Sequence, residues 1–255
     1  MNIKRKNSKT SKVPKSAFWV GGKHTVLTAL KNKKRIIHKI IIHKKINEIS
    51  NDILLHKNKI VFEEDVFFKK IFRSEIPHQG YAILIEKIVE SNFKNFLKYE
   101  LQPKKNSNII ALDGINDPRN IGSIIRSACA FNIDAILINK KDFNSKSFLL
   151  YKTASGGMDL INIFEVSNII NEINFLKKEN YFIAGLDSNS ETSMYNFPLF
   201  KKNLLIFGSE ENGLKNIIKN SCDSLFKIPI NQKINSLNVS NACSAAFGIL
   251  NYIQK

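Results

Sequence analysis

The chain has 255 residues, of which 43% are hydrophobic, so it is long enough to bury one large core or two ordinary ones. Its formal net charge of +17 exceeds what solubility requires and indicates a polyanionic partner, either nucleic acid or an anionic membrane surface. The sequence has no run of about 18 apolar residues and no apolar stretch followed by a small-residue cleavage site, which favours a soluble protein over a membrane protein.

Basic residues are concentrated at the start of the chain. Residues 1–47 contain no Asp or Glu, whereas Lys and Arg recur from Lys4 to Lys45. Residues 1–17 are rich in Lys, Ser and Asn and have few apolar groups, so we predict a flexible basic arm. A targeting presequence is the alternative, but such segments are amphipathic and Arg-rich, and Arg5 is the only arginine here.

Residues 18–90 alternate between helical and strand-like patterns. Helices are predicted over residues 24–31, 45–56 and 63–72, and strands over residues 36–42, 60–62 and 81–88. A segment of about 75 residues with this alternation is the size of a small α/β domain. Residues 91–106 carry several lysines and Pro103 with little apolar periodicity, so we predict a linker there.

Residues 107–255 show near-continuous apolar runs separated by helical patterns. The runs cover residues 108–112, 135–138, 181–186, 204–207 and 225–228. This pattern predicts an α/β domain with a parallel sheet covered by helices on both faces. Ligands of such sheets bind at the carboxyl ends of the strands, so the loops after these runs are the expected position of a functional site.

The first such loop runs from Asp113 to Gly122 and leads into a helix. Asp117 is a natural N-cap, and Pro118 suits the first helical position. Arg126 stands out on an otherwise small and apolar helix, one turn after Gly122, which leaves the helix surface bare. The planar donors of Arg126 suit a phosphate or carboxylate, although a solvated surface arginine explains the residue equally well.

The second loop follows the apolar run that ends at Phe207. Gly208 would permit close backbone approach to a ligand, and Glu210 is expected near the amino end of the following helix. Turn glycines beside helices are common, so a purely structural turn is the alternative interpretation.

The third cluster follows Ile228 and opens the last helix of the chain. Ser236 or Asn238 is expected to cap this helix, and capping is compatible with a role in an active site. The helix carries small residues at helical spacing, which let another backbone come close at a subunit or domain contact. These are Ala242, Ala245 and Ala246, with Ile249 one turn later.

Several familiar sites are missing. No GxGxxG opens a βαβ unit, and neither a GxxxxGK[ST] phosphate loop nor a GxSxG elbow occurs. Cys129, Cys222 and Cys243 are odd in number, widely spaced and set among apolar residues, as expected of reduced core thiols in a cytosolic protein. The five histidines lack metal-ligand spacing. We therefore predict neither a disulfide framework nor a metal site.

The three clusters, in this order, strongly resemble the motifs of the SpoU family of RNA ribose methyltransferases, also called TrmH. The resemblance covers residues 108–255, and residues 120–126, 208–210, 228–229 and 236–240 carry it. Residues 22–26, with Ala29 and Leu30, and residues 78–80 are similar to the amino-terminal domain of the branch called RlmB, which modifies a guanosine of large-subunit (23S) ribosomal RNA.

The resemblance implies a SPOUT-type, trefoil-knotted α/β domain that binds S-adenosylmethionine and forms a homodimer, behind a small RNA-binding domain similar to ribosomal protein L30e. Pattern reasoning alone would reject a knot, because knots are rare. The backbone near Gly208, Ile228 and Leu237 would hold the cofactor. The side chains implied to surround the reacting ribose are Asn120, Arg126, Glu210, Ser236 and Asn238. Many family members have Gly where this chain has Glu211, so a left-handed backbone there would be strained.

The implied reaction is in-line attack of a ribose 2′-oxygen on a sulfonium methyl group. Because a guanidinium stays protonated at neutral pH, Arg126 is expected to orient the ribose-phosphate and stabilise a developing alkoxide, while phosphate or water takes the proton. Asn120 and Glu210 would orient Arg126 and the ribose.

Two alternatives stay open. The first keeps the enzyme but makes tRNA its substrate, although residues 22–26 and 78–80 favour ribosomal RNA. The second is a non-catalytic RNA-binding or ribosome-assembly factor on the same scaffold. The presence of Asn120, Arg126 and Glu210 favours the enzyme.

Overall fold

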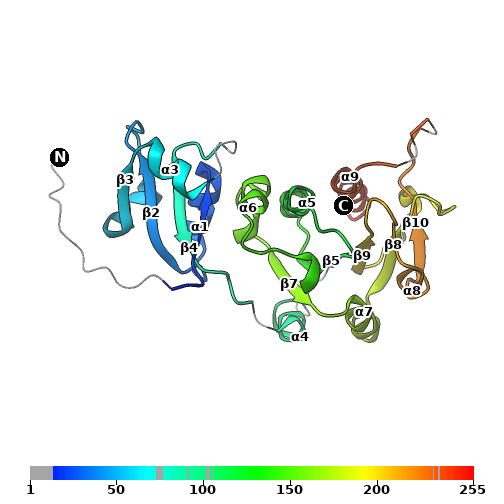
Figure 1. Cartoon of the computed structure of the whole chain (residues 1–255). Coiled ribbons are helices and arrows are strands. Elements are labelled where there is room, and N and C mark those ends of the chain that lie inside the picture. Colours follow the sequence, from blue (N-terminus) through cyan, green and yellow to red (C-terminus); the bar gives the residue numbers. More distant parts are fainter. Residues whose placement is uncertain are drawn as a thin grey trace.

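The computed structural model describes residues 14–72, 77–90, 92–101, 104, 106–231, 233–234 and 236–255 (Figure 1). Most of the predicted basic arm, residues 1–13, lies outside the described residues. The described chain forms two β-sheets, one on each side of residues 86–106. No helix among the described residues is long and apolar enough to cross a membrane.

The first sheet has four strands in the order β1-β4-β2-β3. Strand β4 runs antiparallel to β1 and β2, whereas β2 and β3 are parallel. The strands are β1 (Phe18–Gly21), β2 (Ile37–His43), β3 (Ile60–Glu63) and β4 (Tyr81–Ile85). Three of them confirm the predicted strands. Strand β1 was not predicted, because four residues between a basic segment and a glycine pair show no usable alternation.

The helices of this front domain follow the prediction in two of three cases. Helices α1 (Lys23–Lys31) and α3 (Asp65–Ile71) lie within two residues of the predicted bounds. The helix predicted over residues 45–56 forms only at α2 (Asn51–Leu54), so the prediction is wrong for residues 45–50; the 3-10 turn η1 (Lys57–Lys59) follows the predicted range. Asn and Ser compete with the helix backbone for hydrogen bonds, which explains the irregular stretch before α2.

The segment predicted as a linker is partly helical and packed. It contains α4 (Phe93–Phe96) and the π-helix η2 (Leu97–Leu101). Their buried residues, Phe93, Phe96, Leu97 and Leu101, belong to the core on one face of the second sheet. The linker prediction is therefore wrong for residues 93–101, where intervening lysines hid the apolar face of a short helix.

The second sheet has six strands, all parallel, in the order β10-β8-β9-β5-β6-β7. They are β5 (Ser107–Leu112), β6 (Ala135–Asn139), β7 (Asn162–Val166), β8 (Phe182–Leu186), β9 (Lys202–Phe207) and β10 (Ser224–Phe226). The predicted parallel sheet is confirmed. Edge strand β7 was not predicted, because Asn162 and Glu165 interrupt its apolar run.

Helices cover both faces of this sheet (Figure 1). One face packs against α5 (Pro118–Ala130), α6 (Phe148–Ala154) and α9 (Val239–Ile253), and the other against α4, α7 (Ile169–Lys178) and α8 (Asn216–Lys219). Strand β5 shows why its sequence is continuously apolar: Ile110 and Leu112 enter the first core, whereas Ile109 and Ala111 enter the second. Short 3-10 turns η3 (Lys140–Asp142), η4 (Gly157–Asp159) and η5 (Met194–Asn196) join these elements.

Candidate functional site

Two helices begin at the edge of the sheet where the parallel strands end. Helix α5 begins after Asp117, whose carboxylate accepts a hydrogen bond from the Arg119 N–H at 2.9 Å. Helix α9 begins after Asn238, whose Oδ1 accepts from the Ser240 N–H at 3.0 Å. Both predicted caps are therefore confirmed, and the caps fix the residues beside them in space.

Three predicted site residues from distant parts of the sequence form one polar cluster. The Nδ2 atoms of Asn120 and Asn238 both donate to Glu210 Oε1, at 2.9 and 2.5 Å. Asn238 Nδ2 also lies 3.0 Å from Asn120 Oδ1, and the Val239 N–H donates to Glu210 Oε1 at 3.2 Å. One carboxylate oxygen thus orients two side-chain amides. Glu210 and Asn238 are exposed and Asn120 is half-buried, so a ligand has access to the cluster.

The position of Glu210 differs from the prediction. The helix that follows it in sequence, α8, begins only at Asn216. Glu210 lies instead against the amino end of α9, where it accepts the Val239 N–H. The local sequence pointed to the wrong helix because the loop after β9 turns toward an element much later in the chain.

A cavity of about 300 Å³ lies beside this cluster. Its walls come from the loops after β8, β9 and β10 and from the start of α9, so it lies at the carboxyl ends of the strands, as predicted for a parallel sheet. The lining includes all three predicted cofactor-binding residues and two of the predicted ribose-contacting residues: Gly208, Ile228, Leu237, Glu210 and Ser236.

The loop after β9 is a tight turn that requires glycine. A Cβ atom on residue 208 would lie 2.1 Å from the carbonyl carbon of Gly213. The close backbone approach predicted at Gly208 is thus made by its own loop. Gly213 has a φ of +59°, and its N–H donates to the Ser209 carbonyl at 2.9 Å. Glu211 is not among the described residues with positive φ, so the strain considered for Glu211 does not arise.

A buried carboxylate that the sequence analysis did not select supports this loop. Asp113 directly follows β5, and its two carboxylate oxygens lie 2.7 and 2.9 Å from Lys215 Nζ. Asn139 Nδ2 donates to the same carboxylate at 3.3 Å. Since Lys215 comes two residues after Gly213, the ion pair ties the loop to the end of β5. An acidic residue directly after an apolar strand was the available signal.

Asp187 occupies the corresponding position after β8 and lines the cavity. Its carboxylate lies 2.5 Å from Lys219 Nζ. Burial acts to raise the pKa of Asp187, but hydrogen bonds from Lys219 and from the Asn189 N–H outweigh burial and hold the pKa below its ordinary value. The cavity wall therefore carries a charged carboxylate that is paired with the ammonium of Lys219. Asp187 too was not among the residues predicted from the sequence.

Arg126 does not join the polar cluster. It is exposed on α5, and no hydrogen bond or ion pair links it to any other residue that the structure describes. The predicted orientation of Arg126 by Asn120 and Glu210 is thus absent from the single chain. Gly122, expected to leave bare surface beside Arg126, is instead covered by α6: a Cβ there would lie 2.7 Å from the Cβ of Thr153.

The cysteines do not offer an alternative nucleophile. All three are free; Cys243 is buried and the other two are half-buried. Burial raises the pKa of both Cys129 and Cys222 to about 11, which strongly disfavours the thiolate at neutral pH. Cys243 lies in the core as predicted, whereas Cys129 and Cys222 lie at the edge of a core.

The amino-acid sequence of this chain is similar to those of known proteins. Residues 107–248 match the model of the SpoU rRNA Methylase family, which is more than half of the chain. A protein of Staphylococcus aureus (strain MSSA476), assigned by name to the TrmH family of tRNA/rRNA methyltransferases, is 31% identical over 227 residues. That alignment covers 88% of this chain and 91% of the relative.

Solved structures of other proteins match the fold of this chain over nearly its whole length, including both domains. The SpoU methyltransferase AviRb from Streptomyces viridochromogenes, solved with AdoMet, superposes with a TM-score of 0.80 at 16% identity, covering 94% of this chain and 91% of that one. An RNA 2′-O ribose methyltransferase gives a TM-score of 0.77 at 18% identity, with 94% and 89% covered. At these identities the likeness establishes a shared fold, and the site must be argued from its own residues.

Proposed function

This chain belongs to the SpoU rRNA methylase family, and from that premise we propose that it transfers a methyl group from S-adenosylmethionine to a ribose 2′-oxygen of RNA. The observation that carries the proposal is the exposed cluster of Asn120, Glu210 and Asn238 at the rim of the cavity. Such a cluster brings donors and acceptors in fixed orientation to the place where the two reactants would meet.

The cavity fits S-adenosylmethionine in its chemistry. Its volume of about 300 Å³ is at the lower end of the range for small-molecule sites, and apolar walls alternate with a few fixed polar groups. The cofactor carries a sulfonium and an ammonium, and the carboxylates that line the cavity, those of Asp187, Glu210 and Glu211, outnumber the one lining ammonium, that of Lys219. The backbone of the tight turn at Gly208 and the segments at Ile228 and Leu237 would hold the cofactor. When bound, it supplies an electrophilic methyl group.

The roles of the chain's residues follow from their bonds. Glu210 Oε1 already accepts three hydrogen bonds, so its role is to hold the two amides rather than to remove a proton. The guanidinium of Arg126 stays protonated, and its exposed position leaves all its donors available to a ribose-phosphate. Such a donor stabilises negative charge that develops on the 2′-oxygen, while the proton leaves to phosphate or water. The exposed Ser236 hydroxyl completes the rim.

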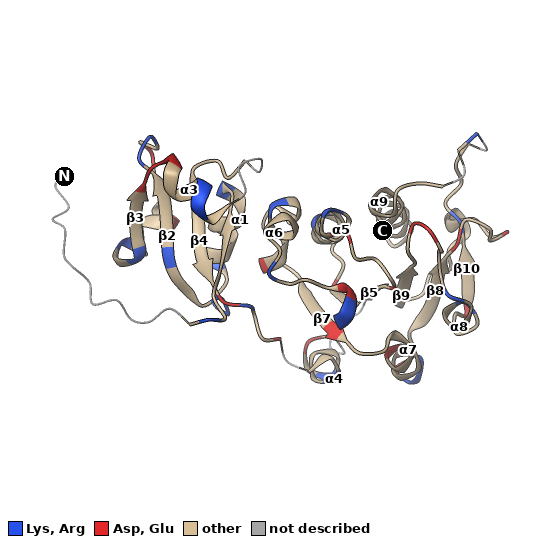
Figure 2. Cartoon of the chain, in the orientation of Figure 1, with Lys and Arg blue, Asp and Glu red and all other residues tan. Residues whose placement is uncertain are grey.

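We further propose that the substrate is a guanosine of 23S ribosomal RNA and that the protein acts in the cytoplasm as a homodimer. Charge supports an RNA-binding role for the front of the chain: residues 1–90 contain 20 basic and 8 acidic residues, whereas residues 107–255 contain 15 and 13. In Figure 2, acidic residues are interspersed among the basic ones throughout the second domain. We also propose a trefoil knot in the second domain, which the family match over residues 107–248 supports, and an L30e-like fold in the first.

Transfer RNA is the second candidate substrate, because the name of the Staphylococcus aureus relative includes both tRNA and rRNA. The test is to incubate the protein with methyl-labelled S-adenosylmethionine and either RNA, digest the product, and identify the labelled nucleoside by mass spectrometry. We expect 2′-O-methylguanosine from large-subunit RNA. Label on a base would contradict ribose chemistry. Cofactor binding without transfer to either RNA would support the non-catalytic alternative.

A further inference from the structure

The two domains meet at a seam in which one short segment of the second domain makes the principal contacts. That segment is α6 with η4, residues 148–159, and it packs against β1 and α1 of the front domain (Figure 1). The apolar part of the seam pairs aromatic rings: Phe72 with Phe148 at 4.2 Å between ring centroids, and Phe18 with Tyr151 at 5.6 Å.

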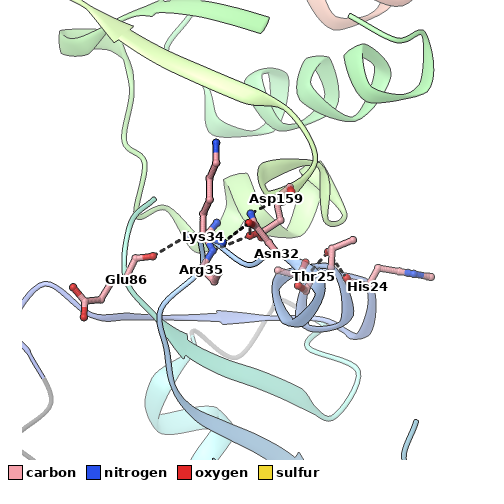
Figure 3. A network of polar contacts seen from close by, with 8 residues as sticks. His24, Thr25, Asn32, Lys34, Arg35, Glu86 and Asp159 are labelled. Atoms are coloured by element: carbon pink, nitrogen blue, oxygen red, sulfur yellow. Dashed lines mark hydrogen bonds and ion pairs between the residues drawn. The ribbon is translucent and has the colours of Figure 1, made fainter. Parts of the chain in front are cut away.

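A buried ion pair crosses the seam (Figure 3). Arg35 Nε in the front domain lies 2.8 Å from Asp159 Oδ1 in the second, and their side chains are 1% and 0% exposed. Asn32 Nδ2 donates to the same oxygen at 3.1 Å and to the Asp159 carbonyl at 3.3 Å. Arg35 Nη1 donates to the Glu86 carbonyl at 2.8 Å, which anchors the guanidinium in its own domain.

Tyr151 adds a second polar connection. Its ring centroid lies 5.7 Å from the Arg35 guanidinium, and its carbonyl accepts a hydrogen bond from Thr25 Oγ1 at 3.3 Å. Burial raises the pKa of Tyr151 to about 12, so the ring beside Arg35 stays neutral. Asp159 is thus the carboxylate that compensates the buried charge of Arg35.

Close steric fit restricts the seam to one arrangement. Gly156 has a φ of +96°, and a Cβ on it would lie 2.4 Å from Thr28 Oγ1 of the front domain. A Cβ on Gly21 would lie 3.0 Å from the Phe148 ring. Glycine on each side of the seam therefore permits an approach that any larger residue would block.

The same segment supports the helix that carries site residues. A Cβ on Gly157 would lie 2.9 Å from Ile125 Cγ2 of α5, and Gly122 of α5 is covered by α6. Helix α5 carries Asn120 and Arg126. The segment that receives the front domain is therefore also the one against which the site helix packs.

We propose that Arg35 and Asp159 are positioning residues that fix the front domain in one orientation relative to the methyl-transfer site, so that RNA held by the front domain presents its ribose to the cluster around Glu210. This inference rests on the proposed function. The physical basis is that a buried ion pair adds little net stability over apolar packing, yet a shifted packing of the same two surfaces would leave a buried charge without its partner. Such a pair selects one geometry.

The test separates alignment from binding and from folding. In Arg35→Ala we expect the methyl-transfer rate at saturating RNA to fall by about 10-fold or more, because small misplacements of reactants are costly. The dissociation constants for RNA and for S-adenosylmethionine should stay close to wild type, since neither domain is altered at its own binding surface. Asp159→Asn, which preserves size and keeps an acceptor for Asn32, should show a smaller fall.

Lys34→Ala is the matched control, because Lys34 is the neighbouring basic residue and its ammonium lies 3.3 Å from Glu90 at the exposed edge of the seam. It should retain the wild-type rate at saturating RNA. NMR relaxation of backbone amides gives a readout that does not depend on activity: wild type should tumble as one body, and Arg35→Ala as two. If wild type transfers no methyl group, the proposed function is contradicted. The relaxation result still shows whether Arg35 fixes the two domains in one orientation.

Wild-type rates together with single-body tumbling in both Arg35→Ala and Asp159→Asn would overturn the inference. Should Arg35→Ala fail to fold, Asp159→Asn and Asn32→Ala carry the same test. Asp159→Asn keeps the size and polarity of the side chain, and Asn32→Ala removes only the amide hydrogen bonds to Asp159. A parallel rise in both dissociation constants with an unchanged saturated rate would also overturn it, since that result places the seam in binding rather than in alignment.

Discussion

The protein contains two polar networks that differ in burial. The cluster around Glu210 joins three side chains at an accessible rim, whereas the pair of Arg35 and Asp159 is sealed between domains. Exposed hydrogen bonds contribute little to folding, because water replaces them readily. A buried pair broken on one side leaves an uncompensated charge. The difference in burial indicates that the cluster around Glu210 serves to bind a ligand, whereas the pair of Arg35 and Asp159 serves to fix the two domains relative to each other.

Among substitutions in these networks and the loops beside them, the largest effect is expected from breaking the exposed network. Glu210→Ala removes the acceptor that orients Asn120 and Asn238. We expect a loss of methyl transfer of about 100-fold, the typical effect of losing one preorganised group, with little change in melting temperature. Rates and thermal unfolding are measured on the same preparation, with the exposed Glu191→Ala as control. If the melting temperature fell together with activity, the cluster around Glu210 would have a structural role like that of the buried pair, which would contradict the distinction between the two networks.

The cavity wall should be the next most sensitive feature. Gly208→Ala places a Cβ 2.1 Å from backbone atoms of Gly213, and overpacking of this kind costs about 1–3 kcal/mol. We therefore expect the affinity for S-adenosylmethionine to fall by about 10-fold or more, as measured by calorimetry. Gly248→Ala is the matched control, since its Cβ would meet the Phe131 ring only at 3.7 Å. Equal affinities for both variants would show that the turn does not shape the cofactor site.

Asp113 combines features of the two networks, because it is buried but supports the site loop. Asp113→Ala leaves Lys215 and Asn139 without their acceptor, so we expect the free energy of unfolding to fall by about 1–3 kcal/mol. Chemical denaturation measures the change. If the denaturation midpoint were unaltered and activity reduced, Asp113 would instead act in methyl transfer, like the cluster around Glu210, and not in stability.

The smallest effect concerns Asp187 and pH. Its folded-state pKa is lowered, so its contribution to stability is present above its ordinary pKa of about 3.9 and is lost as pH falls through the folded value. Asp187→Asn should therefore lower stability at neutral pH by about 1 kcal/mol or less, and the difference from wild type should vanish in strong acid. Denaturation curves at a series of pH values test this, and a difference that grows below pH ~4 would contradict the sign.

The sequence predicted the parts of this molecule that depend on local patterns. Continuous apolar runs such as residues 108–112 identify strands buried on both faces, and Asp117 and Asn238 are caps whose chemistry is local. The cavity at the strand ends followed from the sheet type. The three linked motifs predicted which residues form the polar cluster, but they did not predict the hydrogen bonds between those residues.

The rest of the structure depends on contacts between residues far apart in sequence. Arg35 and Asp159 are 124 residues apart and form no motif, so nothing in the sequence marked the seam. Glu210 packs against α9 rather than the helix that follows it, because the loop's direction is set by tertiary packing. Residues 93–101 were assigned to a linker because exposed lysines interrupt the apolar face that the second core buries.

The most direct test of the central claim is single-turnover methyl transfer by Arg126→Lys and Arg126→Ala, with S-adenosylmethionine binding measured on the same preparations. Lys keeps the charge but loses the planar fork, so we expect both variants to slow by about 100-fold to 1,000-fold while remaining folded and able to bind cofactor. Wild-type rates in both variants would contradict the account, because Arg126 would then be a solvated helix residue with no part in the reaction.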